Sequence, residues 1–197
     1  MSAHAPPPLI LASTSPYRRE LLARLRVPFE CHAPGSDEQR LDGEPADALA
    51  LRLARLKAEA VAARCPGSVV IGSDQVAVRG ADILGKPGTA ERCTDQLLKS
   101  SGREVVFLTA VHVVDGRQGR SESHLDRTVV RFRALTPDEI ARYIAADHPL
   151  DCAGGFKAES LGIALFERIE SADPTALTGL PLIWLSAALR RAGIPVP

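Results

Sequence analysis

Residues 104–132 read EVVFLTAVHVVDGRQGRSESHLDRTVVRF, and this stretch decides the fold class. Its two halves, Glu104–Val114 and Ser121–Phe132, are rich in β-branched and aromatic residues, which favour strands. The Asp115-Gly116 pair between them is typical of a tight turn. We therefore predict two long strands, joined by a short connection, in the middle of the chain.

The segments on either side alternate between strand and helix patterns. The clearest is Thr136-Pro137-Asp138-Glu139, a capping box with proline at the first helical position. Long strands with helices before and after them favour one mixed α/β sheet with helices packed against it. The expected strands are 9–12, 27–31, 68–72 and a hairpin of 76–78 with 83–84; the expected helices are 17–25, 45–64, 89–100, 136–146 and 181–192; residues 153–166 are expected to be a loop followed by a strand.

The composition excludes several classes of protein. The chain has 197 residues, and its 24 Lys and Arg are balanced by 24 Asp and Glu, which argues against a nucleic-acid binder with a broad basic surface. Its four cysteines have neither zinc-site nor disulfide spacing, so we expect reduced thiols in a cytoplasmic protein. No apolar run approaches the roughly 18 residues that a membrane span needs. Residues 1–8 lack the pattern of a signal peptide and are expected to form a short extended lead-in.

The segment Leu9–Arg19, LILASTSPYRR, predicts an anion site. An apolar strand leads to Ser13 and to Ser15, a natural N-cap, and Arg18 and Arg19 then fall in the first helical turn. Free N–H groups at a helix N-terminus, serine hydroxyls and guanidinium groups together suit a phosphate. The alternative is a pair of solvated arginines on an ordinary helix.

Three further segments could belong to a site. Asp74 follows the apolar run at 69–72, so it is either a metal ligand or general base at the end of a strand, or a residue that caps a turn. Lys86, between a glycine and a proline, is either a phosphate contact or an exposed loop lysine. The small residues around Phe156, with Lys157 and Glu159 after it, could surround a flat ligand.

Together these segments resemble the Maf family of nucleotide pyrophosphatases over nearly the whole chain. The matching motifs are S-x-S-P-x-R-R at 13–19, an acidic pair at Asp37-Glu38, a helix lysine at Lys57, G-[AS]-D at 72–74, G-K-P at 85–87, A-G-x-[YF] at 153–156 and G-L-P at 179–181. An apolar residue usually precedes the acidic pair, and here Pro34-Gly35-Ser36 stands there. Either Asp37 or Glu38 could therefore take the metal-facing role.

The resemblance implies a fold and a reaction. Residues 9–197 would form a single domain, with an elongated, twisted mixed sheet and two lobes around a central cleft, as in Maf and inosine triphosphatase-like proteins. The reaction would be hydrolysis of a nucleoside triphosphate to the monophosphate and pyrophosphate, with Mg²⁺ or Mn²⁺ held by Asp37 or Glu38 and by Asp74. Asp74 would also orient or deprotonate the attacking water. The phosphates would meet Ser13, Ser15, Arg18, Arg19, Lys57 and Lys86, and Lys157 would touch either phosphate or base. The family also implies a homodimer.

Three positions resemble the members of the family that cleave 7-methyl-GTP. Tyr17, Gln75 and Glu159 stand where members that cleave dTTP and UTP have arginine, threonine and glutamine. Methylation at N7 makes guanine cationic, and a cationic flat base favours an aromatic face and an acid over an arginine. The alternatives are neutral drift at these positions, a Maf-type pyrophosphatase for dTTP, UTP or CTP, and a non-catalytic nucleotide-sensing factor linked to cell-division arrest.

Overall fold

The computed structural model describes residues 6–197, and residues 1–5 of the predicted lead-in lie outside that part of the chain. In residues 6–197, seven strands form one mixed sheet in the order β2-β1-β3-β5-β6-β7, with β4 also paired to β3. β1 is parallel to β2 and β3, and the remaining pairs are antiparallel. The mixed α/β prediction is therefore confirmed. The strands are β1 (Leu9–Leu11), β2 (Glu30–Cys31), β3 (Val69–Arg79), β4 (Asp82–Leu84), β5 (Glu104–Asp115), β6 (Arg120–Phe132) and β7 (Phe166–Glu170).

Five α-helices of this region form close to the predicted places. The capping box at Thr136 is confirmed, because its side chain accepts from the Glu139 N–H and the Glu139 carboxylate accepts from the Thr136 N–H. No helix within residues 6–197 is both long and apolar enough to cross a membrane. The helices are α1 (Pro16–Ala23), α2 (Ala46–Ala62), α3 (Ala90–Ser100), α4 (Pro137–Asp147) and α5 (Leu182–Arg191), and the 3₁₀ turns are η1 (Ala153–Gly155), η2 (Leu161–Leu165) and η3 (Ala176–Thr178).

Two segments differ from their predictions. The strand expected at 27–31 is confined to β2, and Pro28 within it has no N–H to donate to a ladder. The segment 153–166 forms η1 and η2, and its strand, β7, begins only at Phe166 and runs to Glu170. Gly154 and Gly155 both have positive φ, which bends the chain too sharply for an extended segment.

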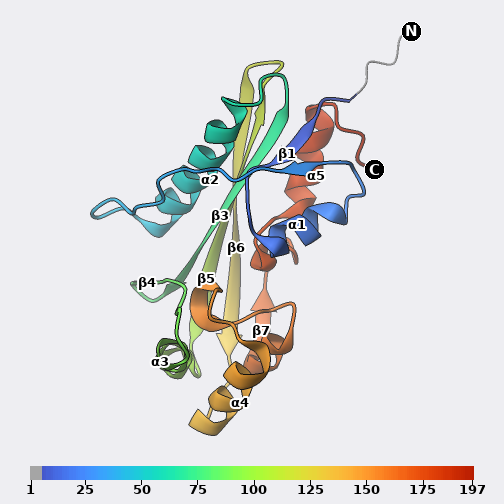
Figure 1. Ribbon diagram of the computed structural model, residues 1–197. Coiled ribbons are helices and arrows are strands. Elements are labelled where there is room, and N and C mark those ends of the chain that lie inside the picture. The colour runs from blue at the N-terminus through green and yellow to red at the C-terminus, as the bar shows by residue number, and fades with distance from the viewer. Residues whose placement is uncertain (1–5) are drawn as a thin grey trace.

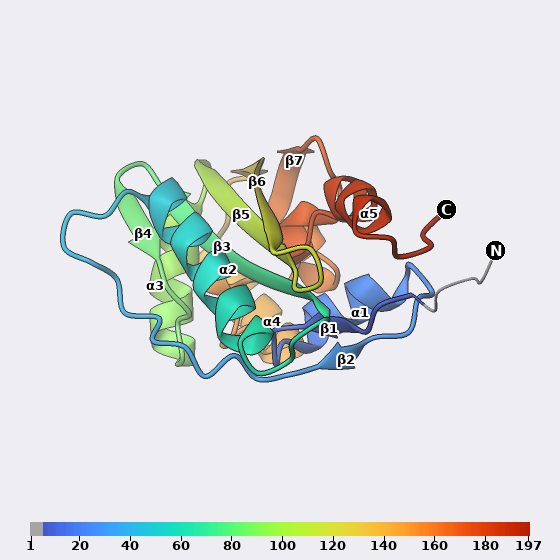
Figure 2. The ribbon, with the colours of Figure 1, turned by 90° about the horizontal axis from the view of Figure 1, so that it is seen from above.

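The long strands β3, β5 and β6 join two lobes (Figure 1). Side chains on one face of the sheet form two separate apolar cores, one with α1 and α5 and the other with α3 and α4. The opposite face packs against α2, and Figure 2 shows α2 and α5 on opposite sides of the sheet. The predicted two-lobed arrangement therefore follows from strands long enough to carry a core at each end.

One edge of β3 is left unpaired in its middle. β5 covers the other edge of β3 from Val69 to Val78. On the open edge, β1 pairs with residues 69–71 and β4 with residues 77–79. Asp74 lies in the gap between these partners, so the prediction that it ends a strand is wrong. β3 continues past Asp74 because its hydrogen bonds to β5 continue, and the side chain is accessible because β1 stops at Leu11.

Gly72 allows α2 to lie directly against β3. A Cβ atom at Gly72 would overlap the carbonyl oxygen of Ala54 and lie 2.6 Å from the backbone nitrogen of Ala58. Any larger residue would therefore push α2 away from the sheet. This close approach brings Lys57 of α2 against Asp74 of β3.

Candidate active site

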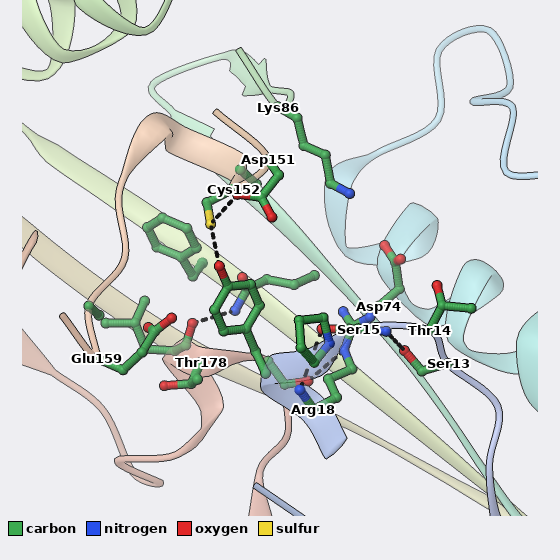
Figure 3. A pocket seen from close by; sticks show the side chains of 18 of the residues that line it. Ser13, Thr14, Ser15, Arg18, Asp74, Lys86, Asp151, Cys152, Glu159 and Thr178 are labelled. Atoms are coloured by element: carbon green, nitrogen blue, oxygen red, sulfur yellow. Dashed lines mark hydrogen bonds between the residues drawn. The ribbon is translucent and has the colours of Figure 1, made fainter. Parts of the chain in front are cut away.

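A pocket of about 360 Å³ opens at this gap, between the two lobes (Figure 3). Its walls come from the β1–α1 connection, α2, the open edge of β3, the loop after β4, the segment around η1, and η3. It therefore collects residues from most of the length of the chain. The predicted site residues that line it are Ser13, Ser15, Tyr17, Arg18, Glu38, Lys57, Asp74, Gln75, Lys86, Phe156 and Glu159.

The β1–α1 connection forms the N-terminal cap that the sequence predicts. The Ser15 N–H donates to Oγ of Ser13 at 3.1 Å, and the Arg18 N–H donates to Oγ of Ser15 at 3.4 Å, with Pro16 at the first helical position. Both serine oxygens therefore accept from the backbone. Their hydroxyl hydrogens are still available to an anion, because a hydroxyl can accept and donate at once.

Arg18 brings a positive charge into the pocket wall. Its Nε donates to the carbonyl oxygen of Gly179 at 3.0 Å, and no carboxylate of residues 6–197 lies within ion-pair distance of its guanidinium. Burial lowers the pKa of Arg18 from its ordinary value, while the charges of Asp74 and Glu38 act in the opposite direction. A partly buried cation that lacks a direct carboxylate partner favours an anionic ligand.

Lys57 lies between two carboxylates. Its ammonium is 2.7 Å from Oδ1 of Asp74 and 3.0 Å from Oε2 of Glu38, and its side chain is 7% exposed. Asp74 therefore does not cap a turn, which was the alternative to a functional role. Two carboxylates that meet at one point in a pocket attract a cation, and here the cation is Lys57.

The structure distinguishes the two members of the acidic pair. Glu38 lines the pocket, whereas Asp37 does not and accepts the Gln39 N–H at 3.0 Å, as in a turn. Among residues 6–197 no group of three His, Cys, Asp or Glu side chains is arranged to hold a metal. Glu38 and Asp74 supply two carboxylates, and Mg²⁺ and Mn²⁺ sites commonly combine one or two carboxylates with oxygens of the substrate. The residues present therefore fit a divalent ion that binds together with a polyphosphate.

The other end of the pocket combines an aromatic ring with acids. The Cys152 thiol is 3.8 Å from the Tyr17 hydroxyl and 3.5 Å from Oδ1 of Asp151. Glu159 lines the same pocket, and Figure 3 shows it with Asp151 and Cys152. Burial raises the pKa of Cys152 to about 12, so its thiol stays protonated at neutral pH. Burial also raises the pKa values of Tyr17 and Glu159.

Gln75 lines the pocket, but its amide nitrogen is engaged with the protein. Nε2 donates to the carbonyl oxygens of Ala176 and Leu177, at 3.1 and 2.9 Å, and lies 2.9 Å from Oγ1 of Thr109. Of its polar atoms, the oxygen Oε1 receives no hydrogen bond from residues 6–197. Gln75 therefore supports the wall of the pocket as well as facing into it.

Two predicted contacts point elsewhere. Arg19 is exposed and is not part of the pocket wall, so the solvated alternative describes it, whereas Arg18 fits the anion site. The Lys157 ammonium donates to the carbonyl oxygen of Asp147 at 2.7 Å, at the C-terminal end of α4, where a helix carries partial negative charge. With that contact, Lys157 is not among the residues that line the pocket, so the structure does not place it for the expected contact with phosphate or base.

The remaining predicted residues do line the pocket. Phe156 is buried in an edge-to-face cluster of phenylalanines and presents part of its ring to the cavity. Lys86 is exposed, and its side chain extends along the pocket (Figure 3).

Sequence reasoning missed several wall residues. Asp151 and Cys152 come directly before the small-residue segment at 153–155, so extending that segment by two positions would have found them. Thr178 comes directly before the G-L-P motif, and no local pattern marks it.

Comparison with known proteins identifies the family of the chain. The model of the family described as Maf-like protein matches residues 8–192. A protein of Pseudomonas putida named 7-methyl-GTP pyrophosphatase is 52% identical over 96% of this chain and 99% of its own length. A protein of Xanthomonas oryzae with the same name is 56% identical over 97% of this chain and 100% of its own length. Among solved structures, the Staphylococcus aureus Ham1 protein aligns with a TM-score of 0.45 and 15% identity, over 63% of this chain and 71% of that one. The chain belongs to the Maf family.

Proposed function

We propose that the chain hydrolyses 7-methyl-GTP to 7-methyl-GMP and pyrophosphate. The observation that carries the proposal is that one pocket is lined both by cations beside two acids and by an aromatic ring with a carboxylate. The names of the relatives from Pseudomonas putida and Xanthomonas oryzae support the same substrate.

The cationic end suits a triphosphate. Arg18, Lys57 and Lys86 offset the negative charge of the phosphates, and the hydroxyls of Ser13 and Ser15 can donate to phosphate oxygens. Phosphoryl-type transfer depends mainly on positioning and on stabilising charge on those oxygens. These are the two tasks that such side chains perform.

The acidic pair suits the attacking water and a metal ion. Asp74 is 8% exposed and held by Lys57, so its second carboxylate oxygen can accept a proton from a water in the pocket or orient that water. Glu38 and Asp74 would hold Mg²⁺ or Mn²⁺, which when bound supplies positive charge to the phosphate oxygens. Lys57 holds the two carboxylates close together whether Asp74 acts on the attacking water or binds the metal ion.

The opposite end suits a cationic purine. The ring of Tyr17 offers a face to a flat base, and a cation–π contact with N7-methylated guanine contributes about 0.5–2 kcal/mol. Glu159 adds a carboxylate that attracts the positive base and can accept hydrogen bonds from its N–H groups. Neither residue gives the same advantage to an uncharged pyrimidine.

The cytoplasmic location, the homodimer and the absence of a nucleic-acid partner stay predictions from the sequence. The four cysteines are free in the structure, in keeping with a reducing compartment. Sedimentation velocity of the purified chain measures the oligomeric state directly.

A panel of substrates tests the proposal. Pyrophosphate release is measured with 7-methyl-GTP, GTP, UTP, dTTP and CTP, with Mg²⁺ and with Mn²⁺, and kcat/KM is compared. GTP is the matched control, because it differs from 7-methyl-GTP only in the methyl group and its charge. We expect the highest kcat/KM for 7-methyl-GTP. A higher value for a pyrimidine triphosphate would instead support a dTTP, UTP or CTP pyrophosphatase, and tight binding without turnover would support a nucleotide sensor.

A further inference from the structure

A row of polar side chains crosses the sheet behind the pocket. Gln75 of β3 is directly opposite Thr109 of β5, and Thr109 is directly opposite Asp126 of β6. Directly paired residues of neighbouring strands project from the same face of a sheet. Thr109 is fully buried and does not line the pocket, whereas its neighbour Gln75 does.

The hydroxyl of Thr109 connects Gln75 to the turn η3. Oγ1 lies 2.9 Å from Nε2 of Gln75 and donates to the carbonyl oxygen of Ala176 at 2.9 Å. Because the carbonyl oxygens of Ala176 and Leu177 only accept, the nitrogen of the Gln75 amide must face them. Oγ1 of Thr109 is a third acceptor within reach of Nε2, so the two amide hydrogens are shared among Thr109, Ala176 and Leu177, and Oγ1 in turn donates to Ala176.

The same turn is held from the pocket side. The carbonyl oxygen of Gly179 accepts from Oγ of Ser73 at 2.8 Å and from Nε of Arg18 at 3.0 Å. Residues 177–179 form part of the pocket wall, which Arg18 and Tyr17 also line. The position of this turn therefore affects both the guanidinium and the space left for the base.

We propose that Thr109 is a positioning residue for base selectivity, acting through Gln75 and the turn η3. Valine has the shape of threonine without the hydroxyl, so it would fill the site but remove one acceptor from Gln75 and one donor from the Ala176 carbonyl, which would keep only its bonds from Gln75 and from the Gly179 N–H. Serine keeps the hydroxyl and can make both bonds. That the selected base is 7-methylguanine rests on the proposed function. That Thr109 and Gln75 hold the turn η3 in place does not.

Three variants separate positioning from packing. Thr109→Val removes the anchor, Thr109→Ser keeps it, and Thr128→Val removes an equally buried hydroxyl from the neighbouring strand β6, where it contacts Ser171 at 2.9 Å. We expect Thr109→Val to lower kcat/KM for 7-methyl-GTP about tenfold, mainly through KM, and to lower the preference over GTP. Thr109→Ser and Thr128→Val should stay close to the unchanged protein.

A measurement without substrate tests the anchor by itself. The Gly179 N–H donates to the carbonyl oxygen of Ala176 at 2.9 Å, so its hydrogen exchange reports the stability of the turn. We expect faster exchange at Gly179 in Thr109→Val than in Thr109→Ser or Thr128→Val. Should Thr109→Val not fold, Gln75→Met removes the donor from the other end and should have the same effect on exchange.

The outcomes are distinguishable. Unchanged exchange and unchanged kinetics in Thr109→Val would overturn the positioning role, and so would an equal kinetic loss in Thr128→Val. If the unchanged protein prefers another triphosphate, the proposed substrate fails. The exchange result and the kinetics with the preferred triphosphate then still decide the role of Thr109.

Discussion

Replacement of Asp74 by asparagine is the sharpest test of the proposed reaction centre. Asparagine keeps the shape of the side chain but loses the negative charge needed by a general base and by a metal ligand. Lys57 remains 3.0 Å from Glu38, so the ammonium is not left without a partner. We therefore expect a stability loss of only about 1–2 kcal/mol, from exchanging an ion pair for a hydrogen bond between the Lys57 ammonium and a neutral amide oxygen.

The catalytic loss should be larger than the loss of stability. Removal of a general base lowers kcat by about 10²–10⁴-fold, or about 3–5 kcal/mol in activation free energy. Nucleotide binding should stay measurable, because Arg18, Lys57 and Lys86 are unchanged. Pyrophosphate release at saturating 7-methyl-GTP gives kcat, calorimetry gives the affinity, and thermal unfolding gives the stability.

A matched control exists in the same sheet. Asp115 is 5% exposed and ion-paired with Arg117 at 3.2 Å, but it lies outside the pocket. Asp115→Asn should keep full kcat while losing a comparable amount of stability. A folded Asp74→Asn protein that keeps most of its turnover would refute the base and metal roles of Asp74. Equal kcat losses in both variants would show that the effect is structural.

Further substitutions test the base end, the packing and the pH dependence. Tyr17→Arg combined with Glu159→Gln should lower the kcat/KM preference for 7-methyl-GTP over GTP about tenfold; an unchanged ratio would contradict the role of these residues. Gly72→Ala should destabilise the chain by about 1–3 kcal/mol or more through a clash with the backbone of α2, whereas Gly85→Ala, with nothing within 4 Å of the new Cβ, should leave Tm nearly unchanged. Burial raises the pKa of Asp126, so the folded state binds this proton more tightly than the unfolded state, and the stabilisation is lost as pH rises through the raised pKa. Asp126→Asn should therefore raise Tm relative to the unchanged protein more at about pH 8 than at about pH 4; an equal difference at both would contradict this assignment.

Local interactions made part of the molecule predictable. The helix that begins after Thr136 depends on hydrogen bonds between residues three positions apart, and the cap at Ser15 depends on its own next three residues. The β3–β4 and β5–β6 pairs also form between segments close in sequence. Such contacts are visible in a sequence because both partners lie within a few residues of each other or of a short turn.

The errors in the site have a common physical cause. Asp74 was expected at the end of a strand, but β3 continues past it. The residues around Asp74 do not show that the pairing of β1 with β3 ends at Ile71, three residues before Asp74, and leaves Asp74 on an open edge. Lys157 was expected at phosphate or base, but the C-terminal end of α4 attracts it. In each case the deciding partner belongs to another element of the fold.

The sequence by itself determined the mixed α/β class, the order of the helices and strands, and the residue types of the site, because these depend on periodicity, capping and motif spacing. Only the tertiary structure decided that Glu38 and not Asp37 reaches Lys57, and that Gln75 anchors a turn about one hundred residues away along the chain. Long-range contacts are set by how the whole sheet and its helices pack, and no short stretch of sequence contains that information.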